Sequence, residues 1–283
     1  MAGVQLLARK HLGYDCGFPS GFSSGVPMAS QKPIVLHEYP MTVSPFARYG
    51  FLLALACAVA AIFAGPGHRA GWWHYHISFD ILKWAAYAGV AAALLSLVGA
   101  VQSRPGGTRR GFVQALLGIL IGLAVFAGPV MMLRTARQVP PIHDISTDTA
   151  SPPKFVAVLP LRAGAENTAE YGGPELAAQQ QKAYPRIQTL LLEVAPDKAT
   201  ARAAAAARAL GWEIVAEVPA EGRVEATDTT LWFGFKDDVV IRVTPTDKGS
   251  RVDVRSVSRV GVSDLGANAR RIEAFMKKLP GTP

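Results

Sequence analysis

Cysteine is nearly absent from this 283-residue sequence. Its two cysteines, Cys16 and Cys57, both precede the C-terminal half of the chain. The C-terminal half therefore contains no thiol that could form a correct or an incorrect disulfide, and it can fold in an oxidising compartment. Cysteine usage is thus compatible with export, although it does not by itself indicate export.

Acidic residues are scarce in the first half of the sequence. Residues 1–137 contain 11 basic and 3 acidic side chains, whereas residues 138–283 contain 18 of each sign. The formal net charge of +8 therefore comes entirely from the first half. In a membrane-like region, basic residues mark cytoplasmic loops rather than contacts to phosphate. The charge distribution thus removes the main support for nucleic-acid binding, and we expect no nucleic-acid partner.

Charged residues are also few in three long apolar runs of the first half. These runs cover residues 46–65, 79–101 and 111–133, and about 20 apolar residues are enough to cross a bilayer. We predict a three-helix transmembrane region over residues 41–136, with the lipid bilayer as its partner. For the first run, the alternative is a signal peptide that is cleaved after the small residues at its end.

The arginines between the apolar runs predict the orientation of the helices. The second connection contains Arg104, Arg109 and Arg110, whereas Arg69 is the single arginine of the first connection. Because positive charge accumulates in cytoplasmic loops, we predict that the second connection and the N-terminus are cytoplasmic. The residues after Leu133 are then exported, which predicts a bacterial inner-membrane protein with a periplasmic C-terminal domain.

The first 40 residues mix glycine, serine and proline without hydrophobic periodicity. This composition predicts a disordered N-terminal extension over residues 1–40. Met41, which directly precedes the first apolar run, is an alternative start of the protein.

Small residues spaced four apart occur in two of the apolar runs. Gly118 and Gly122 form one such pair, and Ala85 and Gly89 form another. Such pairs let helix backbones approach closely within lipid. We expect them to pack the three helices of one chain together, and a homodimer through the membrane helices is the alternative.

Aromatic and histidine residues gather in the connection between the first two runs, at Trp72-Trp73-His74-Tyr75-His76 with His68 nearby. The histidines could contribute to a metal site, but the loop offers neither a carboxylate nor a cysteine to complete it. Tryptophan and tyrosine are typical of the membrane–water interface. We therefore interpret the loop as an interfacial belt and predict no metal ion and no cofactor.

The second half of the sequence predicts a small α+β domain. Residues 137–153 contain two Pro-Pro pairs and predict an extended linker, which leaves residues 154–283 for the domain. Short turns between segments of period 2 favour antiparallel strands. We predict a membrane-anchored α+β protein in which a four- or five-stranded antiparallel sheet, with helices on one face, follows three transmembrane helices. The strand candidates are residues 190–194, 212–218, 223–229, 231–235, 239–244 and 251–258, and the helix candidates begin at Gly173, Pro196 and Leu265.

Two segments of this domain have a distinctive sequence. The first begins Glu225-Ala-Thr-Asp-Thr-Thr-Leu-Trp-Phe-Gly-Phe, and the second, from Arg251, contains Arg-Ser-Val-Ser-Arg and then Ser-Asp-Leu-Gly-Ala-Asn. Together with Pro140-Pro-Ile-His-Asp and Ala183-Tyr-Pro, they resemble the bacterial family catalogued as domain of unknown function 1499 over about residues 138–280. His143 departs from the family, in which we expect a polar residue such as asparagine. The resemblance implies an envelope domain, with similar membrane helices in several members, and implies no activity.

Catalytic templates do not fit the sequence. Gly261-Val-Ser-Asp-Leu-Gly is one residue too long for the GxSxG motif of serine hydrolases, and His143 lies about 120 residues away from it. Asp237 and Asp238 could bind a cation, but their place between two strand candidates favours a solvated turn. We assign no catalytic residue, and we expect the protein not to be an enzyme.

One group of residues could form an anion site. Arg255 and Arg259 lie at the end of a predicted strand, and Ser263 or Asp264 can cap the helix that follows. A guanidinium beside a helix N-terminus suits an anionic ligand, and Trp232 is the residue expected to line a pocket there. The alternative is that both arginines pair with nearby aspartates and brace the strand-to-helix corner, which we favour.

Two functional interpretations follow. The favoured one is a non-catalytic periplasmic domain that binds an envelope component or a protein partner. The alternative is an enzyme or a transporter accessory that acts on an anionic small molecule at the Arg255–Asp264 site. A concave pocket beside Arg255 and Asp264 would favour the second interpretation, whereas a filled corner would favour the first.

Overall fold

The computed structural model describes residues 41–281. The predicted N-terminal extension over residues 1–40 lies outside the described residues.

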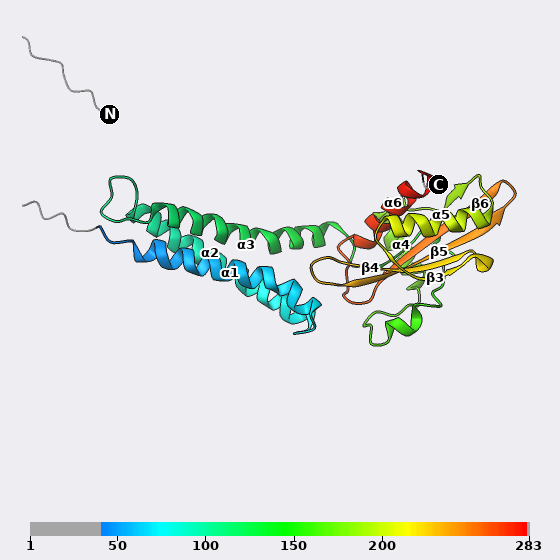
Figure 1. Cartoon of the computed structure of the whole chain (residues 1–283), viewed down its shortest axis with the longest axis horizontal. Coiled ribbons are helices and arrows are strands. Elements are labelled where there is room, and N and C mark those ends of the chain that lie inside the picture. The colour runs from blue at the N-terminus through cyan, green and yellow to red at the C-terminus, as the bar shows by residue number, and fades with distance from the viewer. Residues whose placement is uncertain (1–40, 282–283) are drawn as a thin grey trace, which may run out of the picture. The chain divides into compact units, whose positions relative to one another are not determined.

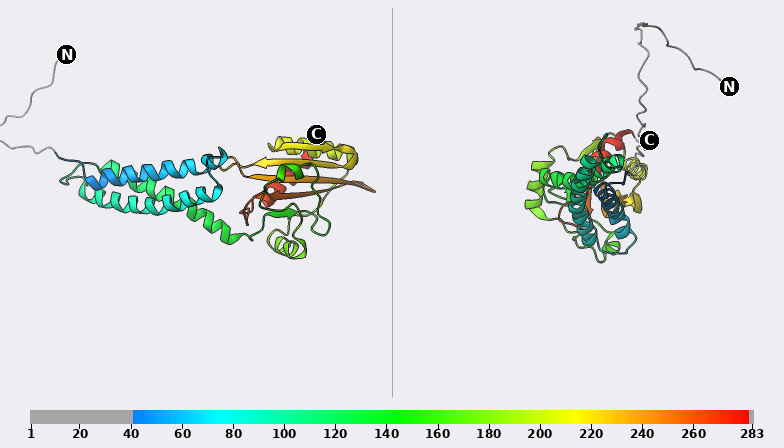
Figure 2. Two further views of the ribbon diagram at one scale, coloured as in Figure 1. Left: turned by 90° about the horizontal axis from the view of Figure 1, so that it is seen from below. Right: turned by 90° about the vertical axis from the view of Figure 1, so that its left-hand side faces the viewer.

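Three long helices form the first part of the described chain: α1 (Pro45–Arg69), α2 (Tyr75–Gln102) and α3 (Phe112–Gln138). By length and composition, each is able to cross a membrane, and Figures 1 and 2 show them side by side. Ser44 begins α1, where its side chain accepts a hydrogen bond from the Ala47 amide, and proline follows at the first helical position. The three predicted spans are confirmed as helices, each somewhat longer than its apolar run.

Small residues allow these three helices to pack closely. A Cβ atom added at Gly122 would collide with the carbonyl oxygen of Gly89, and one added at Gly118 would collide with the hydroxyl of Ser96. Both glycines of α3 therefore contact α2 of the same chain, as close helix packing in lipid requires. Homodimer formation through other helix faces stays a prediction.

The C-terminal part contains a six-stranded antiparallel sheet with strand order β1-β6-β5-β4-β3, in which β2 also pairs with β6. β1 and β2 share one edge of β6, because β1 pairs with residues 255–257 and β2 with residues 250–252. The predicted antiparallel sheet is confirmed. The strands are β1 (Asp144–Ser146), β2 (Leu190–Leu192), β3 (Glu213–Val218), β4 (Arg223–Thr229), β5 (Lys236–Thr246) and β6 (Gly249–Ser258).

Two segments differ from the sequence-based expectation. β1 lies within residues 137–153, which were expected to be a linker, so the sheet domain already begins at Asp144. Residues 231–235 were expected to be a strand but form the connection between β4 and β5, closed by a hydrogen bond of 2.8 Å from the Thr230 amide to the Phe235 carbonyl. The aromatic residues of this connection pack against the membrane helices instead of within the sheet.

The two faces of the sheet are covered differently. α5 (Pro196–Ala209) and α6 (Ala267–Lys278) cover one face and bury the larger core, in which the rings of Trp212 and Phe275 stack with centroids 5.5 Å apart. The other face is covered by irregular chain from about residue 147 to residue 171, through Phe155 and Val158. A third helix, α4 (Gly173–Ala183), follows this covering segment. The predicted α+β fold, with its main helices on one face, is confirmed.

Candidate functional site

Arg255 is buried on the sheet face that the irregular segment covers. Its guanidinium donates two hydrogen bonds to Asp144, of 2.9 and 2.8 Å, and further bonds to two backbone carbonyls. The rings of Phe155 and Tyr171 lie 5.2 and 5.3 Å from the guanidinium carbon. Arg255 is only 2% exposed. Its guanidinium makes these contacts within the protein and is therefore not available to a ligand.

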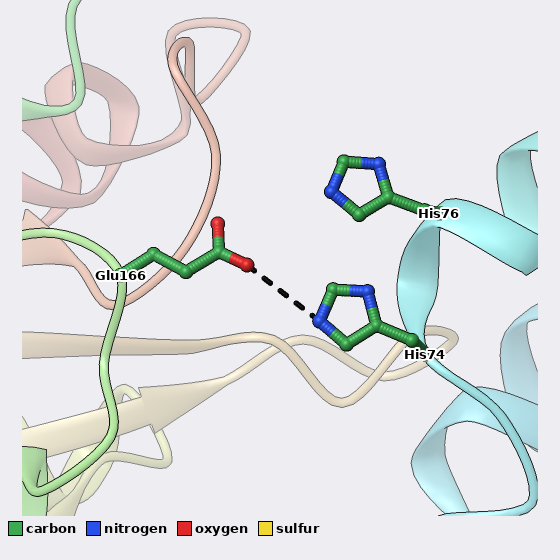
Figure 3. A group of neighbouring side chains, drawn as sticks. All are labelled: His74, His76 and Glu166. Atoms are coloured by element: carbon green, nitrogen blue, oxygen red, sulfur yellow. Dashed lines mark ion pairs between the residues drawn. The ribbon is translucent and has the colours of Figure 1, made fainter.

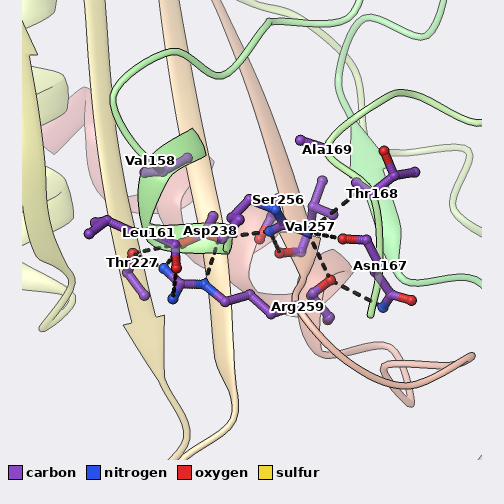
Figure 4. A network of polar contacts seen from close by, with 12 residues as sticks. Val158, Leu161, Asn167, Thr168, Ala169, Thr227, Asp238, Ser256, Val257 and Arg259 are labelled. Carbon is purple, nitrogen blue, oxygen red and sulfur yellow. Dashed lines mark hydrogen bonds and ion pairs between the residues drawn. The ribbon is translucent and has the colours of Figure 1, made fainter. Parts of the chain in front are cut away.

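Arg259 is paired in the same way. Its guanidinium donates to both carboxylate oxygens of Asp238, at 2.9 and 2.8 Å, and to the Leu161 carbonyl at 2.7 Å, as Figure 4 shows. Burial alone would raise the pKa of Asp238, but hydrogen bonds from Arg259, Thr227 and Arg162 outweigh burial and lower that pKa below its ordinary value. These contacts tie β4, β5 and the end of β6 together.

The expected solvated turn at Asp237 and Asp238 is wrong. Both residues lie in β5 and are buried, on opposite faces of the sheet. Asp237 accepts a hydrogen bond of 2.6 Å from Arg271 of α6, and Asp238 binds Arg162 and Arg259. Buried carboxylates require such partners, and these partners are far away in the sequence.

Ser263 and Asp264 lie in the loop before α6. The carboxylate of Asp264 accepts hydrogen bonds from the Gly266 and Asn268 amides, at 2.7 and 2.8 Å. The expected cap is therefore made by Asp264, which occupies amides that an anion would need. Burial raises the pKa of Asp264, and these two amide hydrogen bonds oppose the rise.

Trp232 lies away from both arginines. Its indole Nε1 donates to the Ile62 carbonyl of α1 at 3.1 Å, and its ring lies against Gly65. The structure therefore does not bring the five predicted site residues together. Arg255 and Arg259 are consumed by internal ion pairs, whereas Ser263, Asp264 and Trp232 line a separate pocket.

This pocket has a volume of about 440 Å³ and lies between the domain and the ends of α2 and α3. Three aromatic rings define it, since Phe79 of α2 lies 5.4 Å from Phe233, which stacks on Phe235 at 4.8 Å between centroids. Among the described residues, those that line the pocket include no lysine and no arginine. The lining comprises Tyr75, His76, Phe79, Met132, Thr230, Trp232, Phe233, Phe235, Asp237, Ser258, Val260, Gly261, Val262, Ser263, Asp264, Leu265 and Ala267.

A second cavity adjoins the aromatic pocket. It has a volume of about 470 Å³ and runs between α2 and α3, past Ala86, Phe126 and Leu133. Phe79, Met132, Ser263 and Leu265 line both cavities, which makes them neighbours. An apolar chain lying between α2 and α3 could therefore extend into the aromatic pocket beside the domain.

The lining of the pocket is mainly apolar, with aromatic and aliphatic walls. Its polar groups are hydroxyls and carboxylates at the domain side, and Tyr75 and His76 at the start of α2. Asp237 is already paired with Arg271, and Asp264 already caps α6. Such a lining suits the apolar part of an amphipathic molecule.

Comparison with known proteins identifies the C-terminal region. Residues 144–279 match the model of the family described as Protein of unknown function (DUF1499). These residues form a DUF1499 domain. The predicted family is thereby confirmed, and with three helices that can cross a membrane the chain is a membrane protein carrying a DUF1499 domain. None of the curated proteins that were compared matches the chain.

The family motif is largely structural in this DUF1499 domain. Ser256 and Asn268 bond to each other at 2.6 Å, Asn268 donates to Ser258 at 2.9 Å, and Arg271 donates to Asn268 at 2.5 Å. Together with Arg255 and Arg259, these residues hold α6 and the covering segment onto the sheet. The sequence features that reveal the family therefore stabilise the fold, and the pocket lies next to them.

Sequence reasoning missed the aromatic residues that form the pocket. The sequence predicts a strand for Phe233 and Phe235 and an ordinary membrane span for Phe79. One signal was available: Leu231, Trp232 and Phe233 are consecutive large apolar residues, which breaks the alternation of a strand. In the structure Leu231 and Trp232 are 88% and 40% exposed. Exposed apolar residues on a loop indicate a contact surface.

Proposed function

We propose that this is a bacterial inner-membrane protein whose DUF1499 domain lies in the periplasm and binds an envelope lipid without catalysis. The arginines of the loop between α2 and α3 support the orientation, since Arg104, Arg109 and Arg110 favour a cytoplasmic loop. Since α3 crosses the membrane once after this loop, the domain would lie on the opposite side from the loop, in the periplasm.

The observation that carries the proposal is the aromatic pocket at the end of the α2–α3 groove. Its walls come both from membrane helices and from domain loops. An acyl chain in the groove would lie against mainly apolar side chains, with Lys83 as a charged residue of the lining, and its polar end would meet Thr230, Ser263 and Asp264 at the domain. Apolar burial drives such binding, and a few polar groups orient the ligand.

The alternative function, action on an anionic ligand as an enzyme or a transporter accessory, has less support. It required Arg255 and Arg259 to face a pocket, yet both donate to buried aspartates. The pocket that exists is lined by two carboxylates instead. Among the described residues that line this pocket, none is a lysine or an arginine that could pair with a phosphate or a carboxylate, so a neutral or zwitterionic lipid is the better candidate.

Lipid retention tests the proposal directly. The full chain is purified in mild detergent, and bound lipid is measured by native mass spectrometry. We expect one tightly retained lipid per chain in the wild type and a severalfold reduction in Ser263→Trp, because Ser263 lines both cavities. Ser151→Trp places the same side chain at an exposed position outside both cavities and should retain lipid as the wild type does.

Two results would contradict the proposal. One is equal lipid retention in Ser263→Trp and the wild type. The other is a second protein occupying the pocket, seen as cross-links from a photoreactive residue at position 262 to protein and not to lipid.

A further inference from the structure

Two histidines and a glutamate from distant parts of the chain face one another. His74 and His76 lie at the start of α2, and Glu166 lies between the 3₁₀ helix Leu159–Arg162 and α4. One potential ligand atom from each residue lies within 4.8 Å of the other two. His74 Nε2 and Glu166 Oε1 are 3.6 Å apart, and Figure 3 shows the three side chains converging.

The two imidazoles are arranged to act together. Their rings are nearly parallel, with 13° between the planes and 5.0 Å between the centroids. Each ring turns a nitrogen toward Glu166 (Figure 3). The pair therefore directs two nitrogen ligands toward one point, whereas a single histidine of an interfacial belt would offer only one.

The glutamate is held in place by its surroundings. Tyr75 donates a hydrogen bond of 2.7 Å to Glu166 Oε2, which leaves Oε1 for the histidine side. The next residue, Asn167, is anchored through its amide to the Arg259 carbonyl at 3.0 Å and through its side chain to the Gly261 carbonyl at 2.9 Å. Support of this kind orients carboxylate ligands in metal sites.

We propose that His74, His76 and Glu166 bind a zinc ion, with water in the fourth position. Two histidines and one glutamate are a known three-residue ligand set for Zn²⁺. In tetrahedral coordination with bonds of about 2.0–2.1 Å, neighbouring ligand atoms are about 3.4 Å apart. The present separations of up to 4.8 Å need only small rotations of exposed side chains to reach that value.

This inference goes beyond lipid binding and does not depend on it. The sequence did not predict the site because the loop with the histidines contains no carboxylate, and the missing ligand comes from 90 residues further along the chain. A bound ion would fasten the covering segment of the DUF1499 domain to the start of α2. It would thereby fix the wall of the aromatic pocket, to which Tyr75 and His76 both contribute.

Cobalt(II) is a suitable spectroscopic probe of the site, because Zn²⁺ itself is silent. The full chain is purified in detergent without a polyhistidine tag, stripped with a chelator and titrated with Co²⁺. We expect one Co²⁺ per chain, with the intense visible absorption of four-coordinate cobalt, and its displacement by one equivalent of Zn²⁺. His74→Ala, His76→Ala and Glu166→Gln should each weaken binding at least tenfold.

A matched control uses a histidine outside the cluster. His143 contacts the Val262 carbonyl and lies in the domain, so His143→Ala should bind Co²⁺ as the wild type does. Ser263→Trp, which tests lipid binding, should also bind Co²⁺ normally, so that the two proposals can fail separately.

Three results would overturn the metal site. They are the absence of stoichiometric binding in the wild type, unchanged affinity in the double variant His74→Ala/His76→Ala, and an equal loss in His143→Ala. X-ray absorption at the zinc edge of the loaded wild type needs no variant. It should show two imidazoles in the first coordination sphere, and a spectrum without them would also reject the site.

Discussion

Arg255 shows how a charged residue can be mistaken for a ligand site. In the sequence it follows alternating polar and apolar residues and precedes a helix start, as an anion-binding arginine would. In the structure it is enclosed by Asp144, two carbonyls and two aromatic rings. Removing it would leave the Asp144 carboxylate buried without its partner, which is far more costly than losing a surface ion pair.

We predict that Arg255→Ala destabilises the DUF1499 domain by about 3 kcal/mol or more. The measurement is denaturant unfolding of the full chain in detergent, followed by the tryptophan fluorescence of the domain. Arg186 is 87% exposed in its side chain and lies 3.7 Å from Glu273, so Arg186→Ala should change stability by less than about 0.5 kcal/mol.

The same experiment distinguishes a bracing role from a ligand site. If Arg255 bound an anion, Arg255→Ala would be as stable as the wild type, and phosphate would stabilise the wild type but not the variant. We expect no such phosphate-dependent shift in either protein.

The partners of charged residues could not be predicted from the sequence. Asp238 binds Arg162 and Arg259, and Glu225 accepts amide hydrogen bonds from Val156, Ala157 and Val158 at 3.0–3.1 Å. These particular partners are 21 to 76 residues away, and no local pattern specifies such pairings. By contrast, Thr227 and Arg223, which bond to Asp238 and Glu225, are 11 and 2 residues away. The cap at Asp264 was predictable, because a cap depends only on the residues that adjoin its helix.

At the scale of elements, the success of prediction followed the strength of the local pattern. α5 begins at Pro196 and ends before Gly211, and α6 has a continuous apolar stripe, so both could be predicted. β1 has three residues, too few for a periodic pattern, and exists because β6 offers it an edge. The loop over residues 231–235 is rich in aromatic residues because these contact α1 and α2, and not because it alternates like a strand.

The short strand β1 should matter more to stability than its length indicates. We predict that a fragment of residues 138–283 unfolds cooperatively in urea and is more stable than a fragment of residues 147–283 by about 3 kcal/mol or more. The shorter fragment lacks both the hydrogen bonds of β1 to β6 and the Asp144 partner of Arg255.

A variant of the longer fragment separates the two contributions. Asp144→Ala in residues 138–283 keeps the backbone pairing of β1 but removes the carboxylate, so its stability should fall between the two fragments. Both fragments expose the same loop over residues 231–235, which therefore does not affect the comparison. Equal stability of the two fragments would show that β1 is dispensable.

At the scale of the whole molecule, several contacts link the domain to one end of the membrane helices. Trp232 donates to Ile62 near the end of α1, Arg69 donates to the Leu231 carbonyl, and Tyr75 donates to Glu166. Three helices that alternate in direction bring the end of α1, the start of α2 and the end of α3 to the same side. The domain then shares a side with the α1–α2 connection and lies opposite the α2–α3 connection.

The orientation of the chain in the membrane can be tested through the positive charges of the two connections between the helices. The α2–α3 connection contains Arg104, Arg109 and Arg110, whereas the α1–α2 connection contains Arg69. Because cytoplasmic loops carry the excess of positive charge, we predict that a reporter fused at residue 106 is active only if the reporter functions in the cytoplasm. A reporter fused after residue 283 should be active only if it functions in the periplasm.

The three arginines can then be tested as the cause of this orientation. Replacing Arg104, Arg109 and Arg110 by alanine leaves no arginine in the α2–α3 connection and Arg69 in the α1–α2 connection. The cytoplasmic and the periplasmic reporter fused after residue 283 should then both become partly active. Replacing Arg134 and Arg137 removes two positive charges from the predicted outer side and should leave the wild-type pattern intact. Activity of the periplasmic reporter at residue 106 of the wild type would show that the topology is the reverse. The DUF1499 domain would then lie in the cytoplasm, which would refute a periplasmic lipid-binding role.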